Sequence, residues 1–168
     1  MVSFDTVNPL FGGTTGNETK LVSHLEELAR AWGLTTRRAP VAGNPEENLI
    51  VTCEPVPGGE WLMFESHLDT VSVVGMTVPP HAGRVEGGKL YGRGACDTKG
   101  SGAAMLWALR EFARDARRPR NAALVGCGRA AARAIVQKRT ARLRQVGARE
   151  PAVVGKRIQH GAEIVGVC

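Results

Sequence analysis

The sequence predicts an α/β fold, in which helices pack on a central sheet. Three observations indicate it: an amphipathic helical segment near the N-terminus, two short apolar segments typical of strands, and a second helical segment followed by a third apolar one. The resulting order is helix, strand, strand, hairpin, helix, strand, which favours an α/β sandwich. The 168 residues suffice for one domain with a substantial core and are few for two.

The first helix is expected between Asn17 and Gly33, which are a suitable N-cap and a natural stop. Its apolar residues recur at helical spacing: Leu21, Val22, Leu25, Leu28, Ala29 and Trp32. The same spacing puts Glu26, Glu27 and Arg30 on the more exposed face.

Strands are expected over residues 48–54, 60–66 and 121–125. The second is apolar along most of its length, so we expect it in the interior of the sheet. Residues 82–94 read as a hairpin with a Gly-Gly turn, and residues 101–114 as the second helix.

The composition changes near residue 125. From Gly126 onward the chain has nine of its 22 Lys and Arg residues but only two of its 16 Asp and Glu residues, so the net charge of +6 belongs to the tail. The last aromatic residue is Phe112. We therefore expect a catalytic domain over residues 1–125 and a divergent basic tail over residues 126–168.

The cysteine pattern and the N-terminal sequence predict a cytoplasmic protein. The four cysteines are scattered without a CxxC pair, which favours a reducing compartment over a disulfide scaffold. The N-terminus lacks the pattern of a secretory signal, and no apolar run approaches the roughly 18 residues of a membrane span.

The stretch FESHLDTV, residues 64–71, places His67 and Asp69 at the end of an apolar run. Residues two apart in a strand share a face, and a metal-binding histidine often donates its second ring N–H to a carboxylate. His67 as a metal ligand oriented by Asp69 would explain the pair. The alternative is a surface histidine beside a turn aspartate.

The stretch LYGRGACDTKGSGAAM, residues 90–105, puts Asp97 in a glycine-rich loop just before a helix. Glycines let the backbone approach a ligand closely, so Asp97 is a candidate carboxylate ligand; its alternative role is to cap the helix. Arg93 and Lys99 could contact an anionic substrate or lie on a solvated surface.

Together the two motifs closely resemble the di-zinc metallohydrolases that include acetylornithine deacetylase, succinyl-diaminopimelate desuccinylase, aminoacylases and glutamate-releasing carboxypeptidases. The resemblance covers about residues 5–125 and includes the opening NPLFGGTTGNE. It implies a three-layer α/β sandwich of the zinc-exopeptidase type, incomplete here.

The resemblance also implies the chemistry. Two zinc ions, or cobalt, would share a water and a bridging carboxylate, and hydrolyse the amide bond of an N-acyl amino acid or small peptide. His67 would bind one ion, Asp97 would bridge both, and Asp69 would orient His67. Complete relatives form homodimers; neither a specific nucleic acid nor a membrane is implied as a partner.

The chain departs from the family after the third strand. The family places two adjacent acidic residues there, a general base and a ligand, whereas this chain continues GCGRAAARAIVQ and has no Glu-Glu after Asp97. We therefore expect a truncated, inactive fragment that binds zinc weakly or not at all.

A frameshift is our hypothesis for the tail. Codons for Gly126, Cys127, Gly128 and Arg129, read one base later, can encode Ala-Ala-Asp-Glu, which is the kind of sequence that the family would place there.

Two other functions fit single features. Gly126, Gly128 and Ala131 match the G-x-G-x-x-A fingerprint of dinucleotide-binding proteins, with Glu150 about 20 residues further on. The basic tail could bind nucleic acid nonspecifically, although it has no aromatic residue among its basic ones.

Overall fold

The computed structural model of the protein describes residues 1–40 and 47–128. It contains two long helices, α1 (Glu18–Ala31) and α2 (Gly100–Arg114), and two short helical turns, η1 (Pro9–Phe11) and η2 (Ala95–Lys99). Its strands are β1 (Thr35–Pro40), β2 (Glu47–Cys53), β3 (Trp61–His67), β4 (Arg84–Glu86), β5 (Lys89–Tyr91) and β6 (Asn121–Cys127).

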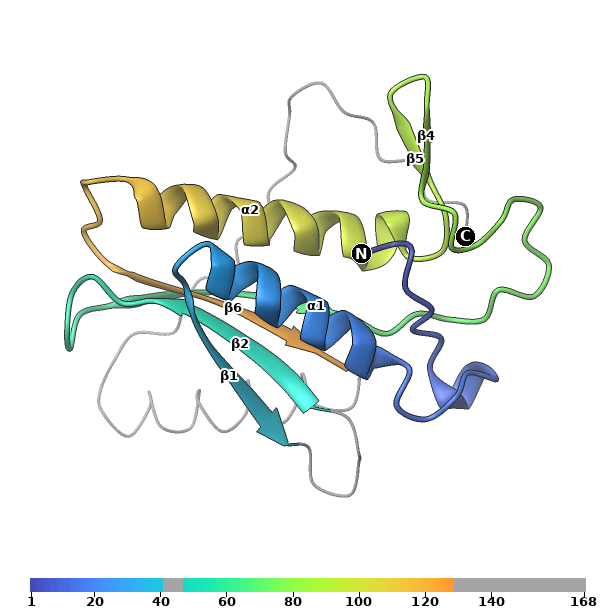
Figure 1. The fold of residues 1–168 in the computed structure, drawn as a ribbon, viewed down its shortest axis with the longest axis horizontal. Coiled ribbons are helices and arrows are strands. Elements are labelled where there is room, and N and C mark those ends of the chain that lie inside the picture. The colour runs from blue at the N-terminus through green and yellow to red at the C-terminus, as the bar shows by residue number, and fades with distance from the viewer. Residues whose placement is uncertain (41–46, 129–168) are drawn as a thin grey trace.

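Four strands form one sheet in the order β1-β2-β6-β3. β2 runs antiparallel to β1 and β6, whereas β3 and β6 are parallel and are connected through α2. Both helices lie over the same face of the sheet, as Figure 1 shows. The predicted α/β class is confirmed.

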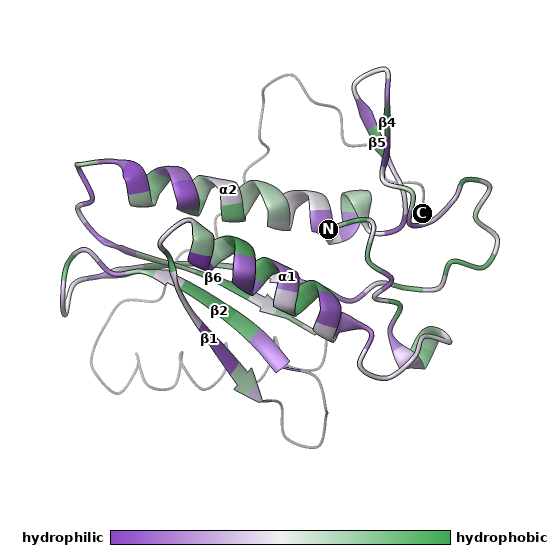
Figure 2. Cartoon of the chain, viewed as in Figure 1, coloured by the Kyte–Doolittle hydropathy of each residue, from purple (hydrophilic) through white to green (hydrophobic). Residues whose placement is uncertain are grey.

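The main core lies between the helices and this face of the sheet (Figure 2). Leu21 and Val22 of α1 and Leu109 of α2 are almost completely buried against Val51 and Leu124 of the sheet. Fully burying one such side chain stabilises a fold by about 1.5–3 kcal/mol, so this apolar layer fixes the helices on the sheet.

Both predicted helices and the hairpin are present. Asn17 stands at the N-cap of α1, but its side chain makes no capping hydrogen bond. Gly87 and Gly88 join β4 to β5 with φ angles of 56° and 74°. Two successive positive φ angles are what a type I′ hairpin turn requires, and glycine adopts them without strain.

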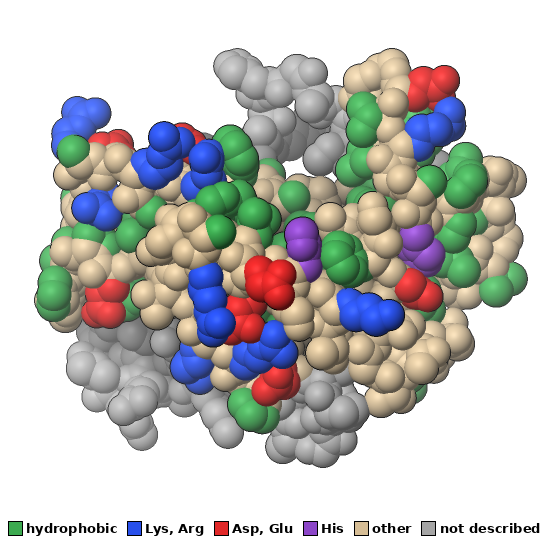
Figure 3. Space-filling model, in the orientation of Figure 1, with side chains coloured by type: hydrophobic (Ala, Val, Ile, Leu, Met, Phe, Trp, Pro, Cys, Tyr) green, Lys and Arg blue, Asp and Glu red, His purple; other side chains and the backbone are tan. Residues whose placement is uncertain are grey.

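Strand β1 was not expected from the sequence, because TTRRAP is polar and ends in proline. Its charge is balanced in three dimensions: Arg38 Nε lies 2.8 Å from Glu26 Oε2, and Arg38 Nη1 lies 3.4 Å from Glu47 Oε2. The exposed position expected for Glu26 is therefore wrong, since Glu26 is buried beneath Arg38 and Arg30. Figure 3 shows acidic and basic side chains gathered together on this side of the molecule.

The interior position expected for the second strand is wrong for the described sheet. β3 pairs with β6 on one side and is an edge strand among the strands that the structure describes. Trp61 and Leu62 are 42% and 47% exposed. The apolar character of β3 therefore did not indicate an interior strand, because its first residues, Trp61 and Leu62, are partly exposed at the edge of the sheet.

Strand β6 continues through Gly126 and Cys127, two residues past the composition boundary. The tail from Arg129 onward, including the basic residues considered for nucleic-acid binding, lies outside the described residues. Within the described residues no helix is long and apolar enough to cross a membrane.

Candidate metal centre

The candidate site lies where the parallel strands β3 and β6 end. His67 is the last residue of β3 and pairs in register with Cys127, the last residue of β6. In α/β sheets ligands bind beyond the carboxyl ends of parallel strands, so His67 stands at the edge where a site is expected.

The second motif reaches His67 through a tight glycine turn. Gly94 has a φ of 78°, and a Cβ there would lie 2.8 Å from the Thr70 methyl carbon. Only glycine therefore allows this close approach without displacing Thr70. The turn leads into η2, which carries Asp97 against the end of β3.

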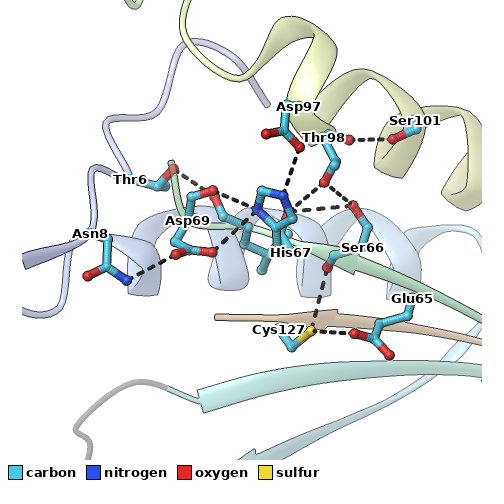
Figure 4. Close-up of polar contacts among 11 residues, drawn as sticks. Thr6, Asn8, Glu65, Ser66, His67, Asp69, Asp97, Thr98, Ser101 and Cys127 are labelled. Atoms are coloured by element: carbon cyan, nitrogen blue, oxygen red, sulfur yellow. Dashed lines mark hydrogen bonds and ion pairs between the residues drawn. The ribbon is translucent and has the colours of Figure 1, made fainter. Parts of the chain in front are cut away.

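His67 lies between two acidic residues, as Figure 4 shows. Its Nε2 is 3.0 Å from Asp97 Oδ1. Its Nδ1 is 2.9 Å from the Asp69 carbonyl oxygen and 3.4 Å from Asp69 Oδ1. A carbonyl oxygen can only accept, so Nδ1 carries a proton. The structure thus brings all three predicted site residues together.

The contact between His67 and Asp69 differs from the predicted one. β3 ends at His67, so the two residues do not share a strand face. The Asp69 main chain supplies the shorter contact, and its carboxylate the longer one. Hydrogen bonding of the His67 ring to Asp69, opposed by burial and assisted by Asp97, raises the pKa of His67 from 6.5 to about 9.

Asp69 is almost completely buried, at 3% exposure. Asn8 Nδ2 donates to Asp69 Oδ2 over 3.0 Å. Burial alone would raise the pKa of Asp69, but the hydrogen bonds from His67 and Asn8 outweigh burial and hold that pKa below its usual value. Asp69 is therefore an anion that lies at the Nδ1 side of the His67 ring, whereas Asp97 lies at the Nε2 side.

The N-terminal strap, residues Phe4–Asn8, holds the chain after β3 in place. Thr6 Oγ1 donates to the Leu68 carbonyl over 2.7 Å, Thr70 N donates to the Thr6 carbonyl over 2.8 Å, and Asn8 N donates to the Thr70 carbonyl over 2.9 Å. Sequence reasoning missed these residues, since the pairing depends on a bridge between Val7 and Thr70 that local pattern does not encode.

Hydroxyl groups tie η2 to β3. Ser66 Oγ and Thr98 Oγ1 are 3.0 Å apart, and Thr98 Oγ1 donates to the His67 carbonyl over 3.1 Å. Thr98 directly follows Asp97, so these bonds help to fix the distance between the Asp97 carboxylate and His67.

A solvated role for Arg93 and Lys99 is wrong. Arg93 is 9% exposed and Lys99 only 1%. Lys99 Nζ donates to the Phe4 carbonyl over 2.7 Å, so this side chain anchors η2 to the strap. Burial, partly offset by Asp5 and Glu18, lowers the pKa of Lys99 to about 8.

The side chains at the site are of types that bind metal ions, but among the described residues there are too few of them to hold one. An imidazole nitrogen and a carboxylate oxygen point at each other, and Asp97 is open to solvent with 78% of its side chain exposed. Protein zinc sites use three or four protein ligands. Within residues 1–40 and 47–128, however, no three His, Cys, Asp or Glu residues are grouped to hold a metal.

The dinucleotide fingerprint fits the end of β6 poorly. Gly126 pairs with Leu49 on one side and Ser66 on the other, so it is part of the sheet and not of a turn after it. The fingerprint needs its first glycine in that turn. Ala131 and Glu150 lie outside the described residues.

Cys53, Cys96 and Cys127 are free thiols.

Comparison with known proteins agrees with the two motifs. Residues 63–135 match the profile of peptidase family M20/M25/M40. The chain is 36% identical over 118 residues to a succinyl-diaminopimelate desuccinylase of Beijerinckia indica, an alignment that covers 67% of the chain and 28% of that enzyme. The chain carries part of an M20 family domain.

Two solved structures share this fold. A metallo-carboxypeptidase of Sulfolobus solfataricus superposes with a TM-score of 0.69 at 17% identity, over 84% of this chain and 33% of that one. Human carnosine dipeptidase 1 superposes with a TM-score of 0.64 at 22% identity, over the same shares. The chain thus spans about a third or less of the length of the proteins it matches.

Proposed function

We propose that this chain contributes the first two metal ligands of a metal-dependent hydrolase of the M20 family. His67 and Asp97 are the ligands, and Asp69 orients His67. The observation that carries the proposal is the 3.0 Å approach of His67 Nε2 to Asp97 Oδ1 across 30 residues of sequence, with Asp69 directly behind the ring.

The substrate class proposed is an N-acyl amino acid or small peptide with a scissile amide bond. The names of the similar proteins, a desuccinylase, a carboxypeptidase and a dipeptidase, support it. When bound, zinc or cobalt ions would acidify a water molecule and polarise the amide carbonyl. The protein's own part is to hold Nδ1 of His67 protonated, which leaves Nε2 as the donor atom.

A cation would have to compete with the Nε2 proton, because only a neutral imidazole binds metal. The Nε2 proton faces the Asp97 carboxylate oxygen at 3.0 Å. Two ligands also leave a zinc ion far short of four-coordinate. We therefore propose that these 168 residues alone bind zinc weakly.

We further propose that the 168 residues alone have no amidase activity. The sequence after Asp97 has no Glu-Glu pair to supply a general base and a further ligand. Loss of a general base alone costs about 10²- to 10⁴-fold in rate. The proposed organisation remains a catalytic part over residues 1–125 and a divergent tail over residues 126–168, in a cytoplasmic protein.

Activity and metal content test this proposal together. The purified chain should hold much less than one zinc per chain after dialysis, and should not hydrolyse N-acetylornithine or N-succinyl-diaminopimelate. Zinc is measured by mass spectrometry and hydrolysis by release of the free amine. Two retained zinc ions with hydrolysis of either substrate would contradict the proposal.

The frameshift hypothesis has a separate test. The nucleotide sequence from codon 115 to a few hundred bases past codon 168 should contain, in the next frame, an acidic pair directly after the codons of β6. An intact frame without such a pair would end the hypothesis while leaving the roles of His67 and Asp97 untouched.

A further inference from the structure

Hydrogen bonds of both its side chain and its main chain hold Asn8 at the end of the strap. Its Nδ2 donates to Asp69 Oδ2 over 3.0 Å, its Oδ1 accepts from Leu10 N over 2.9 Å, and its main-chain N donates to the Thr70 carbonyl. The amide therefore has one orientation only, because a carboxylate can accept but not donate and a backbone N–H can donate but not accept.

The Asp69 carboxylate depends on this amide. Asp69 Oδ2 bonds to Asn8, which leaves Oδ1 to face His67 Nδ1 at 3.4 Å. Asp69 is only 3% exposed, so solvent cannot replace a lost donor easily. A buried carboxylate that loses a hydrogen bond must either turn to find another or bear the cost of desolvation.

We propose that Asn8 is a positioning residue of the candidate metal centre, acting through Asp69 to set the orientation of the His67 ring. The inference rests on the proposed role of His67 as a metal ligand. The relay runs from Asn8 to the Asp69 carboxylate, then to His67 Nδ1, and leaves His67 Nε2 directed at Asp97 (Figure 4).

The substitution Asn8→Asp isolates this role. It keeps an oxygen that accepts from Leu10 N, so η1 remains capped, and it replaces the donor to Asp69 with a second carboxylate oxygen. Two carboxylates would then face each other. Asn8→Ala is the second variant, because it removes the donor without adding charge.

The readout is the ring nitrogen and proton signals of the four histidines in the metal-free chain, recorded by long-range ¹H–¹⁵N NMR. His67 is assigned by the signals lost in His67→Gln. We expect a hydrogen-bonded Nδ1 proton for His67 in the wild-type protein. In both Asn8 variants this signal should persist, because the Asp69 carbonyl remains as acceptor, but it should be displaced as the Asp69 carboxylate turns away from Nδ1. The signals of His24 should persist and report that the variants are folded.

Thr6→Val is the matched control. It removes the buried Thr6 Oγ1 bond to the Leu68 carbonyl, so it loosens the same strap without touching the Asp69 carboxylate. We expect lower stability, by a few °C in Tm, and an unchanged His67 Nδ1 signal. A His67 Nδ1 signal that is not displaced in folded Asn8→Asp and Asn8→Ala, or that is displaced equally in Thr6→Val, would overturn the inference.

A zinc titration of the same samples separates this inference from the proposed function. Displacement of the Nδ1 signal in the Asn8 variants supports the positioning role whether or not zinc binds. If zinc at any concentration leaves the wild-type His67 signals unmoved, the metal-ligand role fails, and with it the functional meaning of the relay.

Discussion

At the scale of single residues, His67 is the group on which the site depends. Its ring contacts two acidic residues that reach it from separate parts of the chain. The sequence could predict that His67, Asp69 and Asp97 belong together, because both motifs resemble those of one family. It could not predict that the Asp69 main chain makes the closer contact, since that follows from where β3 ends.

The raised pKa of His67 makes a prediction about stability. The folded protein binds the His67 proton more tightly than the unfolded chain, with a pKa of about 9 against 6.5. This stabilisation is complete below about pH 6.5 and is lost as the pH rises through about 9. We expect the difference in the free energy of unfolding between wild type and His67→Gln to shrink as the pH rises between these two values.

The measurement is urea unfolding of both proteins in metal-free buffer at about pH 6, 7.5 and 9.5. Asp69→Asn should flatten the pH dependence in the same way, because it removes the main partner of the imidazolium. A wild-type advantage over His67→Gln that is constant or grows with pH would show that His67 does not gain a proton on folding.

At the scale of elements, the N-terminal loop is packed more tightly than its composition suggests. A Cβ at Gly13 would lie 1.7 Å from the Val7 carbonyl oxygen, whereas a Cβ at Gly16 would meet nothing within 4 Å. The sequence NPLFGGTTGNE predicts a loop, but it does not distinguish a glycine that permits close packing from one that only permits a turn.

These two glycines give a matched pair of substitutions. Gly13→Ala forces the backbone of the loop away from Val7 and should cost at least about 3 kcal/mol. Gly16→Ala, whose φ of 84° is the only obstacle, should cost about 1 kcal/mol. Chemical denaturation measures both, and equal costs would mean that the loop does not pack on Val7 as described.

The elements themselves were predicted with uneven success, for identifiable reasons. α1 and α2 follow from apolar spacing alone, and the hairpin follows from Gly87 and Gly88. β1 could not be predicted, because its sequence is polar and the charge of Arg38 is balanced by Glu26 and Glu47, which lie elsewhere in the sequence. The place of β3 in the sheet depends on β6, which follows it by 54 residues.

At the scale of the whole molecule, β3 is an exposed edge of the described sheet. Trp61 and Leu62 begin this edge with large apolar side chains that are nearly half exposed. Exposed apolar edge strands favour association between molecules, and lysine on such an edge opposes it.

We expect Leu62→Lys to reduce concentration-dependent association, with a Tm within a few °C of wild type because Leu62 is not in the buried core. Sedimentation velocity over a range of concentrations measures the effect. Val74→Lys is the control, since Val74 is 88% exposed and lies outside the strand. If wild type and Leu62→Lys associate equally, or if Val74→Lys reduces association as much as Leu62→Lys does, the β3 edge is not the cause of association.

The central claim is that His67 and Asp97 form one cation site, and a zinc titration followed by histidine NMR tests it most directly. The account predicts that the His67 ring signals respond at lower zinc concentration than those of His24 and His81, and that Asp97→Asn abolishes this preference. Zinc that shifts the other histidines first, or that acts on His67 equally well without the Asp97 carboxylate, would contradict it.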